Sequence, residues 1–93
     1  MYAIAFDMDT TKLQKHYTGN NYQNAYYDIK AILYQYGFQP QQGSVYFGNE
    51  NVTAVTCVIA VQILSGTYPW FALSVRDIRM LRIEELNDLK PAI

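Results

Sequence analysis

The first residues of the chain alternate between bulky side chains and small or acidic ones. The bulky members are Tyr2, Ile4, Phe6 and Met8, and between them stand Ala3, Ala5, Asp7 and Asp9. A period of two is typical of a β-strand whose two faces have different surroundings. The pattern predicts a strand with its bulky face toward helices and a small apolar face that ends in acidic residues.

From residue 21 the hydrophobic period changes to steps of three and four residues. The positions that share this face are Tyr22, Ala25, Tyr26, Ile29, Leu33 and Tyr36. This spacing predicts a helix, with Asn21 as its N-cap and Gly37 as the glycine that ends it. Residues 10–21 contain Thr, Lys, Gly and Asn, and we expect them to form a loop.

The second half of the chain contains a hairpin pattern, a long apolar run and a last alternating segment. Phe38–Gln39 and Ser44–Phe47 flank the turn sequence Pro40–Gly43, which predicts the hairpin. Residues 52–64 are rich in strand-favouring Val, Ile and Thr, yet the run is long for a strand, so we expect a buried helix that ends at Ser65-Gly66. After residues 69–71, residues 75–84 predict the last strand, and residues 85–93 form a tail.

The predicted order is strand, helix, two strands, helix and strand, which is the split βαβ arrangement of the α+β ferredoxin-like fold. Right-handed crossovers give an antiparallel sheet in the order 4-1-3-2, with both helices on one face. The first strand is then central, and Asp7 at its end lies beside the starts of strands 3 and 4. Ser44 and Arg76 stand at those starts, so an acid, a hydroxyl and a guanidinium meet at one end of the sheet.

Length and charge limit the class of protein. The 93 residues make a single domain, 1–93, and a chain of this length buries only roughly 60–65% of its unfolded surface. Seven Lys and Arg against eight Asp and Glu give a net charge of −1, which excludes a polycation that coats nucleic acid.

The cysteine count and the longest uncharged segment bear on the compartment. Cys57 stands alone, which excludes an intrachain disulfide and a Cys/His zinc motif, and we expect a reducing, cytoplasmic location. The uncharged stretch 51–75 has an apolar part shorter than the roughly 20 residues of a membrane span, so we expect no membrane association.

The small face of the first strand has a consequence for assembly. Ala3 and Ala5 lie on the face without helices, where small apolar residues favour close packing of a second sheet. A second copy of the chain is the simplest source of that sheet, because a two-fold contact only has to match itself. We therefore expect a homodimer with the two Asp7 side chains near the axis, the alternative being that alanine is merely tolerated there.

Three segments together resemble the virulence-associated protein D (VapD) family: Met1–Asp7 (MYAIAFD), Gln42–Tyr46 (QGSVY) and Ser74–Arg79 (SVRDIR). This family comprises small bacterial toxin endoribonucleases that are related in fold to the small nuclease subunit of CRISPR adaptation. The resemblance runs from residue 1 to about residue 88 and departs from the family pattern at Met80-Leu81. It implies a homodimeric endoribonuclease that acts on RNA, is encoded beside a small antitoxin, and uses Asp7 for catalysis.

Asp7 is the candidate catalytic residue, and the plainer interpretation is a strand-end aspartate that starts a turn. A carboxylate here could also bind Mg²⁺, which prefers oxygen ligands and needs few protein groups. We expect Asp9, two residues further on, to be a solvated turn residue.

Ser44, Arg76 and Arg79 are the candidates for phosphate binding, because hydroxyls and guanidinium groups are suited to phosphate oxygens. The plainer interpretations are that Ser44 satisfies local backbone groups and that Arg76 pairs with Asp7 or Asp77. Arg76 and Arg79 have opposite parity along a strand, so we expect only one of them to reach the site.

Other catalytic classes have little support. His16 is the only histidine, which excludes a two-histidine ribonuclease mechanism within one chain, and we expect it to be a loop residue without chemistry. Phosphate-binding glycine loops and the GxSxG and HExxH motifs are absent. The sequence thus favours an endoribonuclease, with a non-catalytic dimeric scaffold that binds nucleic acid or protein as the alternative.

Overall fold

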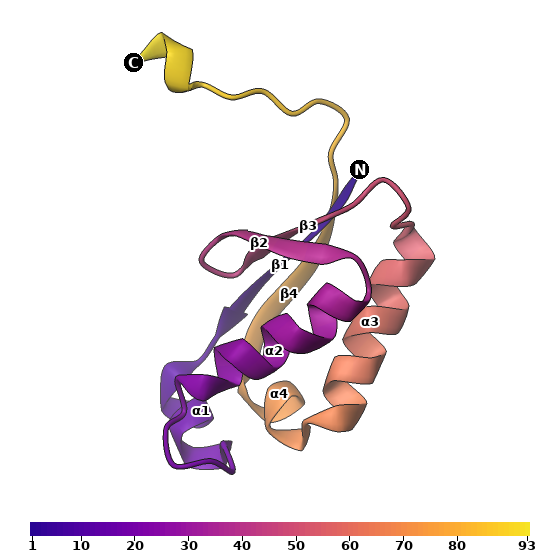
Figure 1. Ribbon diagram of the computed structural model, residues 1–93. Helices are drawn as coiled ribbons and strands as arrows, with labels where there is room; N and C mark the ends of the chain where they lie inside the picture. Colours follow the sequence, from indigo (N-terminus) through magenta and orange to yellow (C-terminus); the bar gives the residue numbers. More distant parts are fainter.

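Four strands form one antiparallel sheet in the order β2-β3-β1-β4, in a computed structural model that describes residues 1–93 (Figure 1). The strands are β1 (Tyr2–Met8), β2 (Phe38–Gln42), β3 (Val45–Gly48) and β4 (Val75–Arg82). The helices are α1 (Thr10–His16), α2 (Asn24–Gln35), α3 (Ala54–Thr67) and α4 (Pro69–Ser74). This order confirms the predicted ferredoxin-like sheet.

The two long helices, α2 and α3, cover one face of the sheet (Figure 1). The bulky residues of β1, Ile4, Phe6 and Met8, are buried on that side together with Leu33 of α2 and Leu64 of α3. The opposite face of the sheet carries no helix and is called the open face below. None of the helices has the length and apolar character needed to span a bilayer.

Two short helices were not predicted from the sequence: α1 lies in a segment expected to be a loop, and α4 lies in a segment to which no element was assigned. Residues 10–21 begin with α1, because the Asp9 side chain accepts a hydrogen bond from the Lys12 amide and Leu13 is fully buried. Residues 69–71 belong to α4, which has Pro69 in its first turn and buries Trp70. One or two helical turns contain too few residues for a hydrophobic period to be recognised in the sequence. Each short helix is stabilised instead by the packing of one large side chain against the rest of the protein.

Several predicted boundaries move by a few residues. Asn21 is not the N-cap of α2; its side chain accepts from the Gln23 amide in a turn that precedes the helix. The proposed turn Pro40–Gly43 lies largely in β2, and the reversal occurs at Gly43-Ser44.

The helix expected over residues 52–64 is α3, which begins after the Thr53 capping box and continues through Ser65-Gly66 to Thr67. The last strand ends at Arg82, and the residues beyond it run away from the body of the protein (Figure 1).

Gly37 ends α2 as predicted, and the conformation explains why glycine is needed. Its φ is +92°, and a Cβ at this position would lie 2.8 Å from Nδ2 of Asn49. The Asn49 amide donates to the Gly37 carbonyl at 2.9 Å, so the turn after α2 is tied to the end of β3.

We predict that Gly37→Ala lowers the free energy of unfolding by about 1 kcal/mol or more, because it combines positive-φ strain with a close contact. The matched control is Gly66→Ala, since Gly66 lies in α3 and a Cβ there meets nothing within 4 Å. That control should leave stability unchanged or raise it, because alanine favours helix. Denaturant unfolding of both variants measures the difference, and equal stability of the two would contradict this account of Gly37.

Candidate active site at the end of the central strands

An irregularity in the pairing of β1 with β4 builds the candidate site. Asp7 pairs with Asp77, but the next residue, Met8, pairs with Val75, so Arg76 has no partner opposite it. An extra residue of this kind is a β-bulge, which breaks strict alternation and redirects a side chain. The bulge aims Arg76 at the end of β1.

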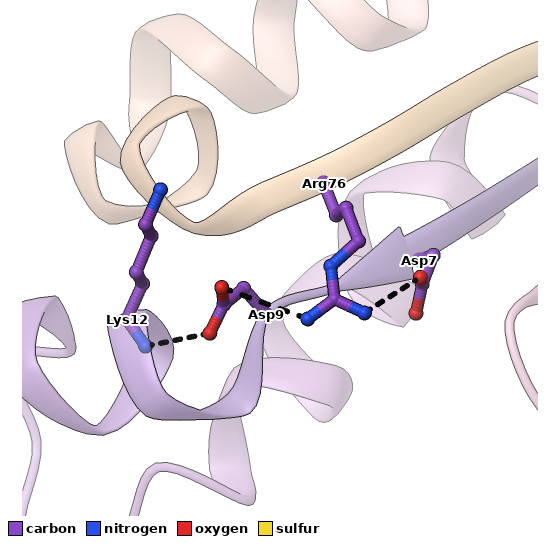
Figure 2. Close-up of polar contacts among 4 residues, drawn as sticks. All are labelled: Asp7, Asp9, Lys12 and Arg76. Atoms are coloured by element: carbon purple, nitrogen blue, oxygen red, sulfur yellow. Dashed lines mark hydrogen bonds and ion pairs between the residues drawn. The ribbon is translucent and has the colours of Figure 1, made fainter.

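Arg76 lies between two carboxylates of the other strand (Figure 2). Its Nη1 is 3.5 Å from Oδ2 of Asp7, and its Nη2 is 3.6 Å from Oδ2 of Asp9. The side chains of Asp7 and Arg76 are both 62% exposed. At these distances and exposures the ion pairs contribute little to stability, so the guanidinium can exchange one carboxylate for another anion at small cost.

Asp9 contributes more to the structure than the solvated turn residue that the sequence predicted. It is the N-cap of α1, and its Oδ1 accepts from the Lys12 amide at 3.0 Å. The Asp9 amide in turn donates to the Ser74 carbonyl at 2.8 Å, which ties the start of α1 to the start of β4. The hydrogen bond from Lys12 lowers the pKa of Asp9, and the charge of Arg76 adds to that effect.

Arg79 lies two residues beyond Asp77 along β4, opposite Ala5. Its Nε donates to both carboxylate oxygens of Asp77, at 3.0 and 3.2 Å. Asp77 stands directly opposite Asp7. Of the two arginines, Arg76 contacts Asp7 within one chain, and whether one or both of them reach a bound phosphate stays a prediction.

Ser44 lies beside the end of β1 as the topology predicted. Its carbonyl accepts from the Phe6 amide at 3.1 Å, so its backbone continues the β1–β3 pairing by one residue. The Ser44 side chain makes no hydrogen bond within the chain. Its hydroxyl is therefore free to donate to a ligand at this end of the sheet.

His16 is in the last turn of α1 rather than in the expected loop, and it makes neither a hydrogen bond nor an ion pair with Asp7, Asp9 or Arg76. Asp77 stands directly opposite Asp7, as the topology predicted for the start of the last strand. Its partner is Arg79 and not Arg76.

The residues of one chain do not fit a complete metal site. No group of three or more His, Cys, Asp or Glu side chains is placed to hold a metal ion. Asp7 and Asp9 share the Arg76 guanidinium, which supplies the positive charge between them. A cation at Asp7 would need ligands from water, from substrate or from a second chain.

The fold and this cluster define a class: a small ferredoxin-like domain with an exposed carboxylate–arginine pair at the end of its central strands. No family model matches the chain. It is 56% identical over 93 residues to "Endoribonuclease VapD 2" of Riemerella anatipestifer, covering 100% of this chain and 99% of that protein. It is 54% identical to "Endoribonuclease VapD homolog" of Helicobacter pylori, covering 100% of this chain and 96% of that protein.

A third relative, "Endoribonuclease VapD" of Dichelobacter nodosus, is 47% identical over 88 residues, which are 95% of this chain and 91% of that protein. The chain belongs to the VapD family. The family expected from the three sequence segments is therefore confirmed.

We predict that Asp9→Ala destabilises the protein at neutral pH and that the loss shrinks in acid. The folded pKa of Asp9 is lowered below its ordinary value of 3.8, so its stabilisation is complete above that value and is lost as the pH falls through the folded pKa. Denaturant unfolding from about pH 7 to about pH 2 should show the two proteins converging in acid. Asp9→Asn is the matched control, because asparagine retains the N-cap and removes the charge. A loss for Asp9→Ala that does not change with pH would contradict this role.

Proposed function

We propose that this protein is an endoribonuclease that cuts RNA phosphodiester bonds at Asp7. The observation that supports this most is the Asp7–Arg76 pair, which combines an exposed carboxylate with a guanidinium that is held only weakly. A carboxylate can accept a proton and a guanidinium can bind a phosphate. The names of the VapD relatives support the same activity.

In the proposed reaction the Asp7 carboxylate accepts the proton of a ribose 2′-hydroxyl. The 2′-oxygen then attacks the adjacent phosphorus and the bond from phosphorus to the 5′-oxygen breaks, while the leaving oxygen takes a proton from water. The products are a 2′,3′-cyclic phosphate and a 5′-hydroxyl end, and Asp7 returns its proton to solvent. An internal nucleophile makes this route favourable because it is already positioned, and DNA lacks it.

Arg76 has the charge and the freedom to stabilise the phosphate as negative charge develops on it. When a phosphate oxygen replaces the Asp7 carboxylate on Nη1, Asp7 is released to act as a base while Nη2 remains near Asp9. The free hydroxyl of Ser44, beside the end of β1, would bind a neighbouring phosphate or ribose. Arg79, which is paired with Asp77, would do the same.

A Mg²⁺-dependent route is the second form of this proposal. Asp7 from each of two copies would contribute to holding the ion, and the ion would supply an activated water and neutralise phosphate charge. The Arg76 guanidinium already bridges Asp7 and Asp9 within one chain. A guanidinium beside a carboxylate opposes its protonation, which suits metal binding better than a role as base. The two routes differ in their response to a chelator.

We propose that the chain is a homodimer that packs through the open face. Ala3 is already fully buried within one chain, between Phe47 and Leu81, so its burial does not require a partner. The support comes instead from Leu81, which is 45% exposed on that face, and from Val45 and Phe47, which are partly exposed. An apolar row on a sheet face without helices favours packing against a second sheet.

We also propose that this endoribonuclease is the toxin of a toxin–antitoxin pair. The side chains of Asp7 and Arg76 are both 62% exposed, so the proposed site is open in the free chain. An open nuclease site can be silenced by a protein that covers it. A small antitoxin protein would do so.

Asp7→Asn should lower the rate of RNA cleavage by about a hundredfold or more, because asparagine cannot accept the proton. The assay compares the two proteins on labelled single-stranded RNA, with and without a chelator. Asp88→Asn is the matched control, since Asp88 is an exposed aspartate in the tail. Loss of cutting on chelation alone would select the Mg²⁺ route.

Equal cutting by wild type and Asp7→Asn would remove Asp7 from the mechanism. If neither protein cuts, the chain is better described as a non-catalytic dimeric scaffold. Cutting of RNA in which the 2′-hydroxyl at the scissile bond is replaced by hydrogen would contradict the direct 2′-hydroxyl route.

We predict that Leu81→Lys converts the homodimer to a monomer, because it places a charge in the apolar row of the open face. Sedimentation velocity measures the change, and an unchanged circular dichroism spectrum shows that the fold is intact. Leu73→Lys is the control, since Leu73 is 55% exposed on α4 and is not on the open face. A wild-type protein that sediments as a monomer would overturn the proposed dimer.

A further inference from the structure

A cleft of about 670 Å³ lies at the end of the sheet opposite Asp7. It is formed where α2 ends, β2 begins and the chain leaves β3 for α3. Fourteen residues line it, and the ones used below are Tyr34, Tyr36, Gln39, Gln41, Asn49 and Asn51. The proposed ribonuclease chemistry does not use any of these residues.

The side chains of the cleft have an unusual composition, because none of the fourteen residues carries a charged side chain. Tyrosine rings stand beside carboxamide groups, and a carboxamide both donates and accepts hydrogen bonds. Without a lysine or arginine side chain the cleft offers phosphate only the α-ammonium group of Met1, and without a carboxylate it is not suited to a metal ion. The ligand that matches is a neutral flat ring with donors and acceptors on its edge, which describes a nucleobase.

The rear of the cleft is formed by backbone that approaches closely. Gly37 and Gly48 lie there, and a Cβ on either would come within 2.8 Å of a side chain, that of Asn49 or Val52 respectively. The Asn49 carbonyl oxygen Oδ1 accepts from the Asn51 amide at 2.9 Å, which leaves the Nδ2 donors of Asn49 without an acceptor. These contacts hold the loop after β3 in one shape, so the free donors are already positioned.

We infer that this cleft binds one base of the RNA substrate at a distance from the cut. Tyr34, whose side chain is 63% exposed, would stack on the base, while Gln41, Asn49 and Asn51 would contact its edge. Asp7 is four residues along β1 from Ala3, which pairs with Phe47 near the cleft, and that separation is about 13 Å. A single strand that spans this distance would place the bound base a few nucleotides from the scissile bond. This inference rests on the proposed endoribonuclease function.

The first test maps the cutting of a randomised single-stranded RNA by sequencing the fragments. Wild type should show a base preference at one position a few nucleotides from the cut. Tyr34→Leu and Asn51→Ala should reduce that preference about tenfold, which is within the range measured for a base stacked on an aromatic ring, while cutting of RNA as a whole persists. Tyr34→Phe should retain the preference because it retains the ring.

Tyr27→Leu is the matched control, because Tyr27 is 70% exposed on the same helix and does not line the cleft. It should leave the preference unchanged. A cutting pattern that is the same in wild type, Tyr34→Leu and Asn51→Ala overturns the inference and leaves the role of Asp7 intact.

The second test does not depend on cutting. The full-length protein is titrated with each of the four ribonucleosides, and the side-chain amide signals of Gln41, Asn49 and Asn51 are followed by NMR. Shifts of these signals that are lost in Tyr34→Leu support a nucleobase site even if the protein cuts no RNA. The absence of cutting would then count against the proposed endoribonuclease function and not against the site. Unchanged signals with all four nucleosides overturn the site. Nucleoside binding with an unchanged cutting pattern would assign the cleft to a free nucleoside and overturn its role in the substrate.

Discussion

The pairing of β1 with β4, regular up to Asp7 and then interrupted by a bulge, sets where the charged groups of the site lie. Cross-strand pairing sets Asp7 directly opposite Asp77, and like charges in that position destabilise a sheet. The unpaired Arg76 and the nearby Arg79 offset that repulsion, one on each side of the aspartate pair. A local arrangement that opposes stability and needs two arginines is typical of a functional site, where sequences depart from the rules that favour folding alone.

Much of the fold could be predicted because its signals are long or repeated. The alternation of β1, the helical period of α2 and the order of elements together determine the sheet topology, and Gly37 was found because a positive φ strongly favours glycine. The short helices α1 and α4 could not be predicted in the same way. Each is held by a buried side chain, Leu13 or Trp70, whose partners come from other parts of the chain.

The candidate site was predictable in its members and less so in its contacts. The topology places Asp7, Ser44 and Arg76 at one end of the sheet, and the structure does bring them there. The bulge leaves no mark in the sequence, since Val75, Arg76 and Asp77 fit an ordinary strand as well as an irregular one. The role of Asp9 as an N-cap and the pairing of Asp77 with Arg79 are side-chain contacts that the topology alone does not predict.

The two ends of the sheet differ in charge, and this difference suits the binding of a nucleic acid strand. One end holds exposed carboxylates and arginines, and the other holds a neutral cleft of tyrosines and carboxamides. A single-stranded RNA has the complementary division, because its backbone is charged and its bases are neutral, flat and rich in hydrogen-bonding groups.

The open face connects these two ends with the proposed assembly. Along β1 it passes from Ala3 and Ala5 to Asp7. In the proposed dimer, a partner whose central strand lies alongside would bring the acidic ends of the two chains toward one another. Two such ends repel unless each carboxylate keeps a cation nearby, which is what Arg76 and Arg79 provide in the free protein. If a phosphate displaces Arg76 from Asp7, the repulsion between the two chains rises as the substrate binds. In the proposed dimer the arginines would serve twice, once to limit repulsion between the two chains and once to bind the phosphate, so the same residues would link assembly to catalysis.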